Sequence, residues 1–117
     1  MNYCLHLRRC FLVRRSLRRQ VSLDTFCSTQ NLRPDIVKID VEGNELSVLR
    51  GGARMFRSAR PRVFLSVHPR QIGVLGGSVE ELGRLITELG YEARDPAGAA
   101  VHQFEFREYV LYPMDRG

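Results

Sequence analysis

The sequence predicts a single layered α/β domain that ends in an antiparallel hairpin, and three observations support this fold class. Two short runs, 36–39 and 62–67, are rich in β-branched and apolar residues, which is typical of strands buried on both faces of a parallel sheet. Residues that favour turns and helices follow each run. The chain then closes on two further runs, 91–94 and 104–112, which suit an antiparallel pair.

The composition is that of an ordinary globular domain. Of the 117 residues, 44% are hydrophobic and 26% are charged, values that exclude a fully disordered chain and a collagen. No apolar run approaches the ~20 residues of a membrane-spanning helix, so no transmembrane segment is predicted. The three cysteines form no CxxC pair. They predict reduced thiols in a cytoplasmic protein, and neither a disulfide framework nor a metal site.

The positive charge is concentrated in an N-terminal arm, residues 1–20. This arm contains six arginines and no acid, whereas residues 21–117 carry the other 12 basic residues and all 13 acidic residues. The net charge of +5 therefore belongs to the arm, and no specific nucleic-acid binding is predicted. The arm resembles an organelle transit peptide and would also suit an anionic partner. The simpler expectation is a poorly ordered arm before a domain over 21–117, or a start site inside a longer gene.

The first half of the domain is predicted to run helix, strand, helix. Capping side chains at Ser22 and Asp24 favour a short helix over 23–31, with Asp24 as a helix-start residue. The strand 36–39 follows. A second helix is expected to begin near Leu46 and to be interrupted or ended by two consecutive glycines, at 51 and 52.

The second half is predicted to run strand, loop, helix and terminal hairpin. The strand 62–67 leads into a glycine-rich loop over 70–77. Ser78 and Glu81 form the pattern of a capping box, in which the serine caps the helix and the glutamate reaches back. Leucines and an isoleucine at helical spacing follow, and Gly90 ends the helix.

Ionisable side chains follow both predicted parallel strands at the point where each strand ends. Asp40, Glu42 and Glu45 follow the first strand, and His68 follows the second. Open α/β sheets bind ligands beyond the carboxyl ends of their strands, so neighbouring strands would bring these groups to one edge. A histidine near carboxylates can act as a general base on a hydroxyl or an amine. Three acids over six residues could also bind a divalent cation or a cationic cofactor.

Each of these residues also has a purely structural interpretation. Asp40 could cap the turn, although an acid that ends a buried strand is costly without a partner. Glu42 could be a solvated turn residue, and Glu45 would suit the dipole of a first helical turn. His68 could be a satisfied histidine at the rim of the sheet. Gly43 would permit the tight turn between strand and helix.

Two stretches of this sequence resemble the FkbM-type S-adenosylmethionine-dependent methyltransferase family. These are Val21–Phe26, which contains an LD element, and Pro34–Gly52, which contains KIDVEGNE followed by a leucine-glycine segment. The resemblance covers about residues 21–112. It implies a Rossmann-like methyltransferase sheet, of which this chain would hold the C-terminal half, ending in the antiparallel hairpin. It also implies methyl transfer from S-adenosylmethionine, usually to a hydroxyl oxygen.

On this interpretation Asp40, Glu42 and His68 are the expected catalytic residues, and Glu45 is expected to bind substrate. The methyl acceptor would be a small molecule or a glycan. The glycine-rich loop that binds the cofactor in the family lies upstream of these strands, and this sequence has no counterpart of it. We therefore expect a fragment of the family's domain, with its cofactor-binding residues unassigned.

A competing hypothesis is a catalytically inactive remnant whose basic arm contacts anionic partners. If the strands on one side of 36–39 are missing, this apolar run becomes an edge strand with one charge among four residues. Exposed edges of that kind pair with other chains. The sequence therefore also favours self-association through 36–39.

Overall fold

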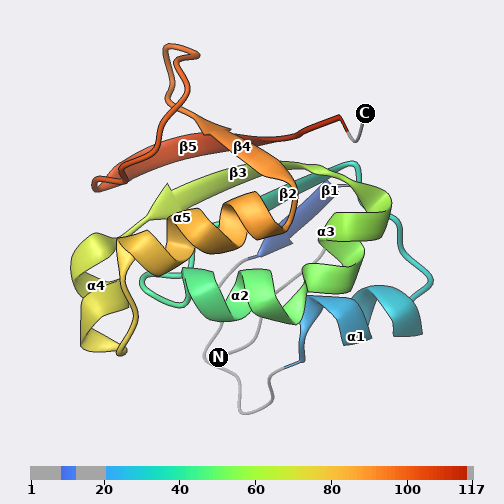
Figure 1. Cartoon of the computed structure of the whole chain (residues 1–117). Helices are drawn as coiled ribbons and strands as arrows, with labels where there is room; N and C mark the ends of the chain where they lie inside the picture. The colour runs from blue at the N-terminus through green and yellow to red at the C-terminus, as the bar shows by residue number, and fades with distance from the viewer. Residues whose placement is uncertain (1–8, 13–20, 116–117) are drawn as a thin grey trace.

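The computed structural model describes residues 9–12 and 21–115, which form one five-stranded sheet with helices packed against one face (Figure 1). The strands in chain order are β1 (Arg9–Leu12), β2 (Ile36–Ile39), β3 (Arg62–Val67), β4 (Tyr91–Arg94) and β5 (Arg107–Pro113). The helices are α1 (Leu23–Thr29), α2 (Glu45–Gly51), α3 (Ala53–Ala59), α4 (Pro69–Val74) and α5 (Val79–Glu88).

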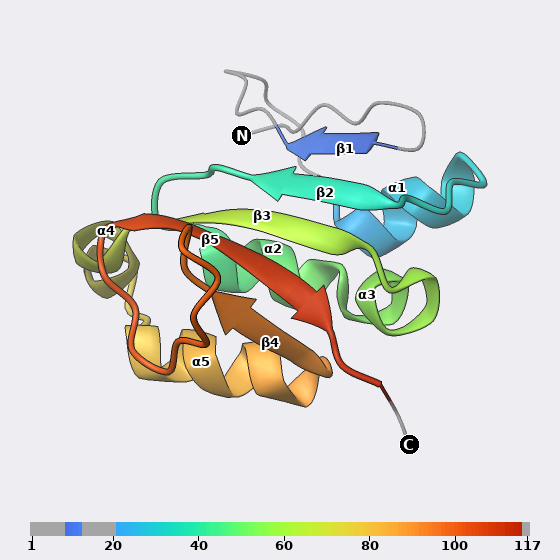
Figure 2. The same ribbon diagram turned by 90° about the horizontal axis from the view of Figure 1, so that it is seen from above.

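The strand order in the sheet is β1-β2-β3-β5-β4. The strands β1, β2 and β3 are parallel, with Val37 of β2 opposite Val63 of β3. The strand β5 lies between β3 and β4 and is antiparallel to both. The last two strands therefore form a hairpin, with β5 next to β3 and β4 at the edge of the sheet (Figure 2). The predicted α/β fold class, a partial Rossmann-like sheet that ends in an antiparallel hairpin, is confirmed.

The strand β1 changes one expectation. Arg9 pairs with Ile36 and Leu12 pairs with Ile39 in a parallel ladder, so 36–39 is not an edge strand. The prediction of self-association through that edge is therefore wrong in its premise. A four-residue strand inside an arginine-rich segment has no alternation that marks it in the sequence. The rest of the predicted arm, 1–8 and 13–20, lies outside the described residues.

Two segments differ from the structure that the sequence predicts. The sequence predicts a glycine-rich loop over 70–77, but helix α4 occupies the first part of this segment, with Pro69 at its start, a position that the fixed φ of proline favours. The final strand, predicted over 104–112, begins only at Arg107, because the segment after Asp95 folds back on β4. There the Val101 N–H donates to the Ala93 carbonyl.

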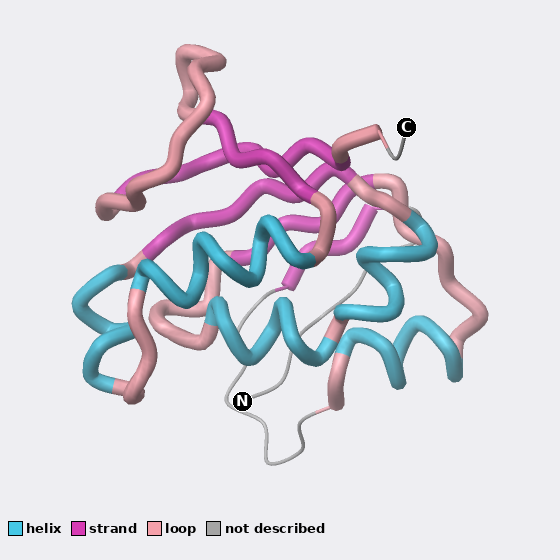
Figure 3. The backbone as a smooth tube through the Cα atoms, in the orientation of Figure 1, coloured by secondary structure: helices cyan, strands magenta, loops and turns pink. Residues whose placement is uncertain are grey.

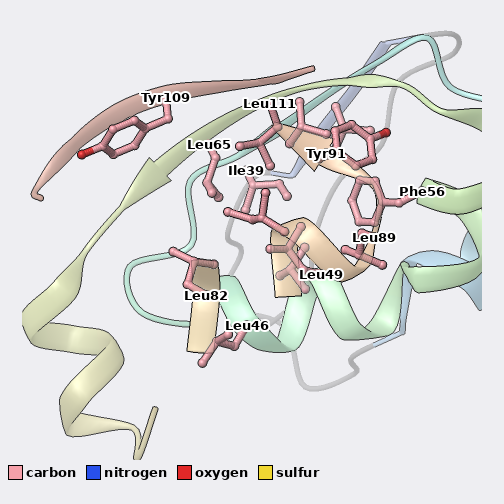
Figure 4. Close-up of a cluster of buried hydrophobic side chains, with 14 of the residues drawn as sticks. Ile39, Leu46, Leu49, Phe56, Leu65, Leu82, Leu89, Tyr91, Tyr109 and Leu111 are labelled. Carbon is pink, nitrogen blue, oxygen red and sulfur yellow. The ribbon is translucent and has the colours of Figure 1, made fainter. Parts of the chain in front are cut away.

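The core lies between the sheet and the helices α1, α2, α3 and α5. Figure 4 shows leucines, isoleucine and aromatic rings from both layers meeting in one cluster. Side chains of β2 and β3 alternate, so that Val37, Ile39, Val63 and Leu65 are fully buried on the helix-covered face. The spacing of Leu82 and Ile86 in α5 places both on the face that packs on the sheet.

The opposite face of the sheet lacks a helical layer in the described part of the chain (Figure 3). It carries Lys38, Arg62 and Phe64, and the Arg62 guanidinium lies 5.0 Å from the centre of the Tyr112 ring. Among residues 9–12 and 21–115, no helix combines the length and the apolarity needed to cross a lipid bilayer.

The amino end of β3 is held by Arg60, which has a left-handed backbone conformation with φ of 55°. Its guanidinium donates to the carbonyls of Leu89, Gly90 and Met114 at 2.9, 2.9 and 2.7 Å. The same group lies 5.1 Å from the centre of the Tyr91 ring. One side chain thus ties the end of α3 to the end of α5 and to the end of β5.

The aspartate of the LD element has a similar structural task. Asp24 lies in α1, but its carboxylate accepts the N–H groups of Arg54 and Met55 at 3.1 and 2.8 Å. It therefore caps α3, while Ser22 caps α1 through the Thr25 N–H. Asp24 lies in the first turn of α1, as expected of a helix-start residue, and its carboxylate also caps a second helix.

Candidate functional site

The turn after β2 builds the first half of the candidate site. Glu42 and Gly43 both have positive φ, 49° and 108°, which reverses the chain between β2 and α2. A Cβ atom on Gly43 would lie 2.7 Å from the Cβ of Gln71, so only glycine lets this turn pack directly on α4. This close approach brings the end of β2 against the end of β3.

Glu45 joins the two strand ends from the interior. Its side chain is fully buried in the first turn of α2. One carboxylate oxygen accepts the Gly43 N–H at 2.6 Å, and the other accepts the His68 N–H at 3.0 Å. Two backbone donors compensate the desolvation of this buried acid, and they explain why it is tolerated there.

His68 lies between Glu45 and Asp40 at the carboxyl end of β3. Its Nδ1 is 3.6 Å from Glu45 Oε1, and its Nε2 is 3.6 Å from Asp40 Oδ1. The His68 side chain is 11% exposed, whereas the Asp40 side chain is 53% exposed. Both separations exceed hydrogen-bond length. In the described residues, His68 Nδ1 is the buried side-chain polar atom that has no hydrogen-bond partner.

The structure brings three of the four predicted site residues together around the imidazole. His68 lies 3.6 Å from both Asp40 and Glu45, and Glu42 is exposed in the turn after β2. Glu45 is enclosed rather than open to a ligand. The assignment of Glu45 as a substrate-binding residue therefore stays a prediction, and the contacts of Glu45 fit a positioning role better.

Two further residues lie at this edge of the sheet, and the sequence does not predict either of them as part of the site. The ring of Phe106 meets the His68 ring edge to face, with centroids 5.3 Å apart, and Phe106 is 72% exposed. On β5, a Glu108 oxygen accepts the Ser66 hydroxyl at 3.4 Å. The only signal in the sequence was the aromatic alternation after Phe104, which does not show that this segment returns to His68.

The groups with shifted pKa values lie away from this edge. Burial, and to a lesser degree the charge of Asp24, raises the pKa of the Cys27 thiol, so this cysteine is held in its unreactive form. Burial also raises the pKa of Tyr91, against the opposing charge of Arg60. Within the part of the chain that the structure describes, no group of three His, Cys, Asp or Glu residues could hold a metal ion.

Comparison with known proteins identifies the family. The model of the methyltransferase FkbM domain matches residues 13–93, a range that includes Asp40, Glu45 and His68 and starts earlier than the expected position 21. A similar solved structure is the methyltransferase FkbM from Methylobacillus flagellatus KT. It is 25% identical, with a TM-score of 0.41, and the match covers 68% of this chain and 20% of that chain. This chain thus spans about a fifth of that relative's length. A search of curated proteins gave no match. Because the domain match covers more than half of the sequence, the chain belongs to the methyltransferase FkbM domain family.

Proposed function

We propose that the edge formed by Asp40, Glu42 and His68 is the acceptor side of a methyltransferase site that uses S-adenosylmethionine. The acceptor would present a hydroxyl group, on a small molecule or a glycan. One observation carries this proposal: an almost buried imidazole is held between a buried and a half-exposed carboxylate at the carboxyl ends of parallel strands. Ligands bind at such edges in open α/β sheets, and the family match supports methyl transfer.

In this proposal His68 is the general base. Its Nε2 lies 3.6 Å from the half-exposed Asp40, and in this proposal it accepts the proton of the acceptor hydroxyl. The Asp40 carboxylate stabilises the imidazolium that forms. Glu42, exposed in the turn, orients the acceptor. A positioned base typically contributes about 10²–10⁴-fold to a rate.

S-adenosylmethionine supplies, when bound, a methyl group on a positively charged sulfur. The exposed carboxylates of Asp40 and Glu42 fit the positive charges of that molecule. The first glycine of the sequence is Gly43, and the space beside it is filled by Gln71. At the end of β2 the described residues therefore fit the charged part of the cofactor, but they leave no open space beside a glycine of this turn for its adenosine.

Weak binding of the cofactor follows from that partial fit. We expect calorimetric titration of the chain with S-adenosylmethionine to give little or no heat of binding. A dissociation constant in the low micromolar range, about −8 kcal/mol, would show that a cradle for the adenosine exists.

Because the chain alone is expected to bind the cofactor weakly, the proposed function is tested in a full-length relative that carries residues 21–112 of this chain in place of its own segment, with labelled S-adenosylmethionine and a panel of sugars and hydroxylated small molecules. We expect Asp40→Asn, Glu42→Gln and His68→Gln to lower methyl transfer, by up to about 10²–10⁴-fold, with little change in the thermal unfolding midpoint. The matched control is His102→Gln, which removes an exposed histidine on another loop.

The outcomes of this test are distinct. If all three variants retain near-full activity, the site lies elsewhere. If they fail to fold, these side chains are structural. A full-length relative that folds with this segment in place but methylates no acceptor of the panel would favour the inactive remnant whose basic arm contacts anionic partners.

A further inference from the structure

We propose that Glu45 is a positioning residue that sets the tautomer of His68, with the imidazole proton on Nδ1 and the lone pair on Nε2. This inference rests on the proposed function, in which Nε2 is the base. It assigns the buried glutamate of the KIDVEGNE segment to the orientation of the histidine, and not to contact with substrate.

The first step of the argument is the immobility of Glu45. Each of its carboxylate oxygens accepts a backbone N–H, one from Gly43 and one from His68, so the group is fixed at both ends. An ionised carboxylate accepts hydrogen bonds and donates none. The ring nitrogen that faces Oε1, Nδ1 of His68, therefore gains by carrying a proton and would be repelled with a lone pair there.

The second step is a competition between two carboxylates at equal distance. Asp40 lies 3.6 Å from Nε2, as Glu45 lies 3.6 Å from Nδ1, so distance alone does not decide where a single proton resides. Exposure decides it, because the Glu45 side chain is 0% exposed and the Asp40 side chain is 53% exposed. A carboxylate attracts an N–H dipole more strongly where it is shielded from water than where water screens it. The proton is therefore held on the Glu45 side.

The third step is the unpaired state of Nδ1. Buried polar atoms are almost always hydrogen-bonded, yet this atom has no partner within hydrogen-bond distance. A shift of a few tenths of an ångström would convert the 3.6 Å separation into a hydrogen bond to Glu45. Catalytic hydrogen bonds are often long before substrate binds. The edge-to-face contact with Phe106 shields one side of the ring.

The tautomer is measured directly by long-range ¹H–¹⁵N correlation NMR on the labelled full chain at alkaline pH, without cofactor or acceptor. We expect His68 to show the Nδ1–H pattern, the reverse of the usual preference of a free histidine side chain. His102, which is exposed, serves as the internal reference for the usual Nε2–H pattern.

The variants separate positioning from simple structural support. Glu45→Gln should shift His68 toward the Nε2–H tautomer, Glu45→Asp should retain part of the Nδ1–H population, and Asp40→Asn should leave the tautomer unchanged. A wild-type His68 that is mainly Nε2–H overturns the proposal, even if Glu45→Gln does not fold. A chain that shows the Nδ1–H form, together with undiminished methyl transfer by the Asp40→Asn, Glu42→Gln and His68→Gln variants in the full-length relative, would overturn the proposed function and leave this assignment intact.

Discussion

At both ends of β3 a charged side chain binds backbone groups, but the two charges have opposite signs. At its amino end, the Arg60 guanidinium binds three backbone carbonyls at 2.7–2.9 Å. At its carboxyl end, Glu45 binds two backbone N–H groups, but the neighbouring His68 Nδ1 stays buried without a hydrogen-bond partner. Both ends place a charged side chain where backbone partners are missing.

The difference between the two ends indicates which of them serves only the fold. A fully satisfied cluster contributes stability, whereas a buried unsatisfied nitrogen costs stability. Sites that break a local rule without a structural gain are the places where function is expected. The amino end of β3 is therefore the structural reference against which the carboxyl end can be tested.

The largest loss of stability is expected at the amino end. Arg60→Met would remove the donors to three carbonyls, and we expect it to lower the free energy of unfolding by about 2–4 kcal/mol. Urea titration measures this change. The matched control is Arg57→Met, an exposed arginine in the last turn of α3, the helix that Arg60 directly follows. Equal stability of the two variants would show that the Arg60 contacts contribute nothing.

A smaller loss is expected where α1 caps α3. Asp24→Ala would leave the N–H groups of Arg54 and Met55 without their carboxylate, and the expected cost is about 1–2 kcal/mol. Asp24→Asn retains one acceptor and should lie between wild type and alanine. The control is the exposed Asp35→Ala. A loss as large for Asp35 as for Asp24 would contradict the capping role.

The smallest effect concerns Tyr91 and depends on pH. Its hydroxyl donates to the Pro61 carbonyl at 2.6 Å, so Tyr91→Phe should cost about 1 kcal/mol at neutral pH. Burial raises the pKa of Tyr91 above the value of about 10 in an unfolded chain. As the pH rises, the unfolded state therefore loses the Tyr91 proton before the folded state does. The contribution of Tyr91 to the free energy of unfolding is fully present below pH ~10 and decreases above it.

The test is a set of urea titrations from neutral to alkaline pH. The stability of Tyr91→Phe should fall less steeply above pH ~10 than that of wild type. Tyr112→Phe, which removes a hydroxyl from the open face of the sheet, should follow the wild-type slope. If the free energy of unfolding of wild type and of Tyr91→Phe fell equally with rising pH, the folded structure would not favour the protonated form of Tyr91.

Local patterns in the sequence predicted most of the sheet. The run 62–67 is β3 residue for residue, and 36–39 is β2, because β-branched residues between turn signals specify such strands. The positions of Asp40 and His68 followed from where those strands end. These inferences needed only neighbours in the sequence and the rule that parallel strands share an edge.

The remaining features depend on partners that are distant in the sequence. In the sequence, Glu45 is typical of an acid in a first helical turn. Its role depends on the His68 N–H, which lies 23 positions later in the chain and donates to its carboxylate. Asp24 looks like a cap for its own helix until α3 packs beside it. Phe106 reaches His68 only because the segment after β4 folds back. No local pattern specifies such contacts.

The left-handed backbone of Glu42 sets selection for a stable fold against selection for a carboxylate at this position. An ordinary L-residue held in that region costs about 1–2 kcal/mol, while glycine adopts it freely and asparagine adopts it more readily than glutamate. A lineage selected only for a stable fold should drift toward glycine or asparagine at this position. If relatives retain glutamate at this position despite that cost, the carboxylate is needed for function. If a relative has lost it, that relative no longer uses the site.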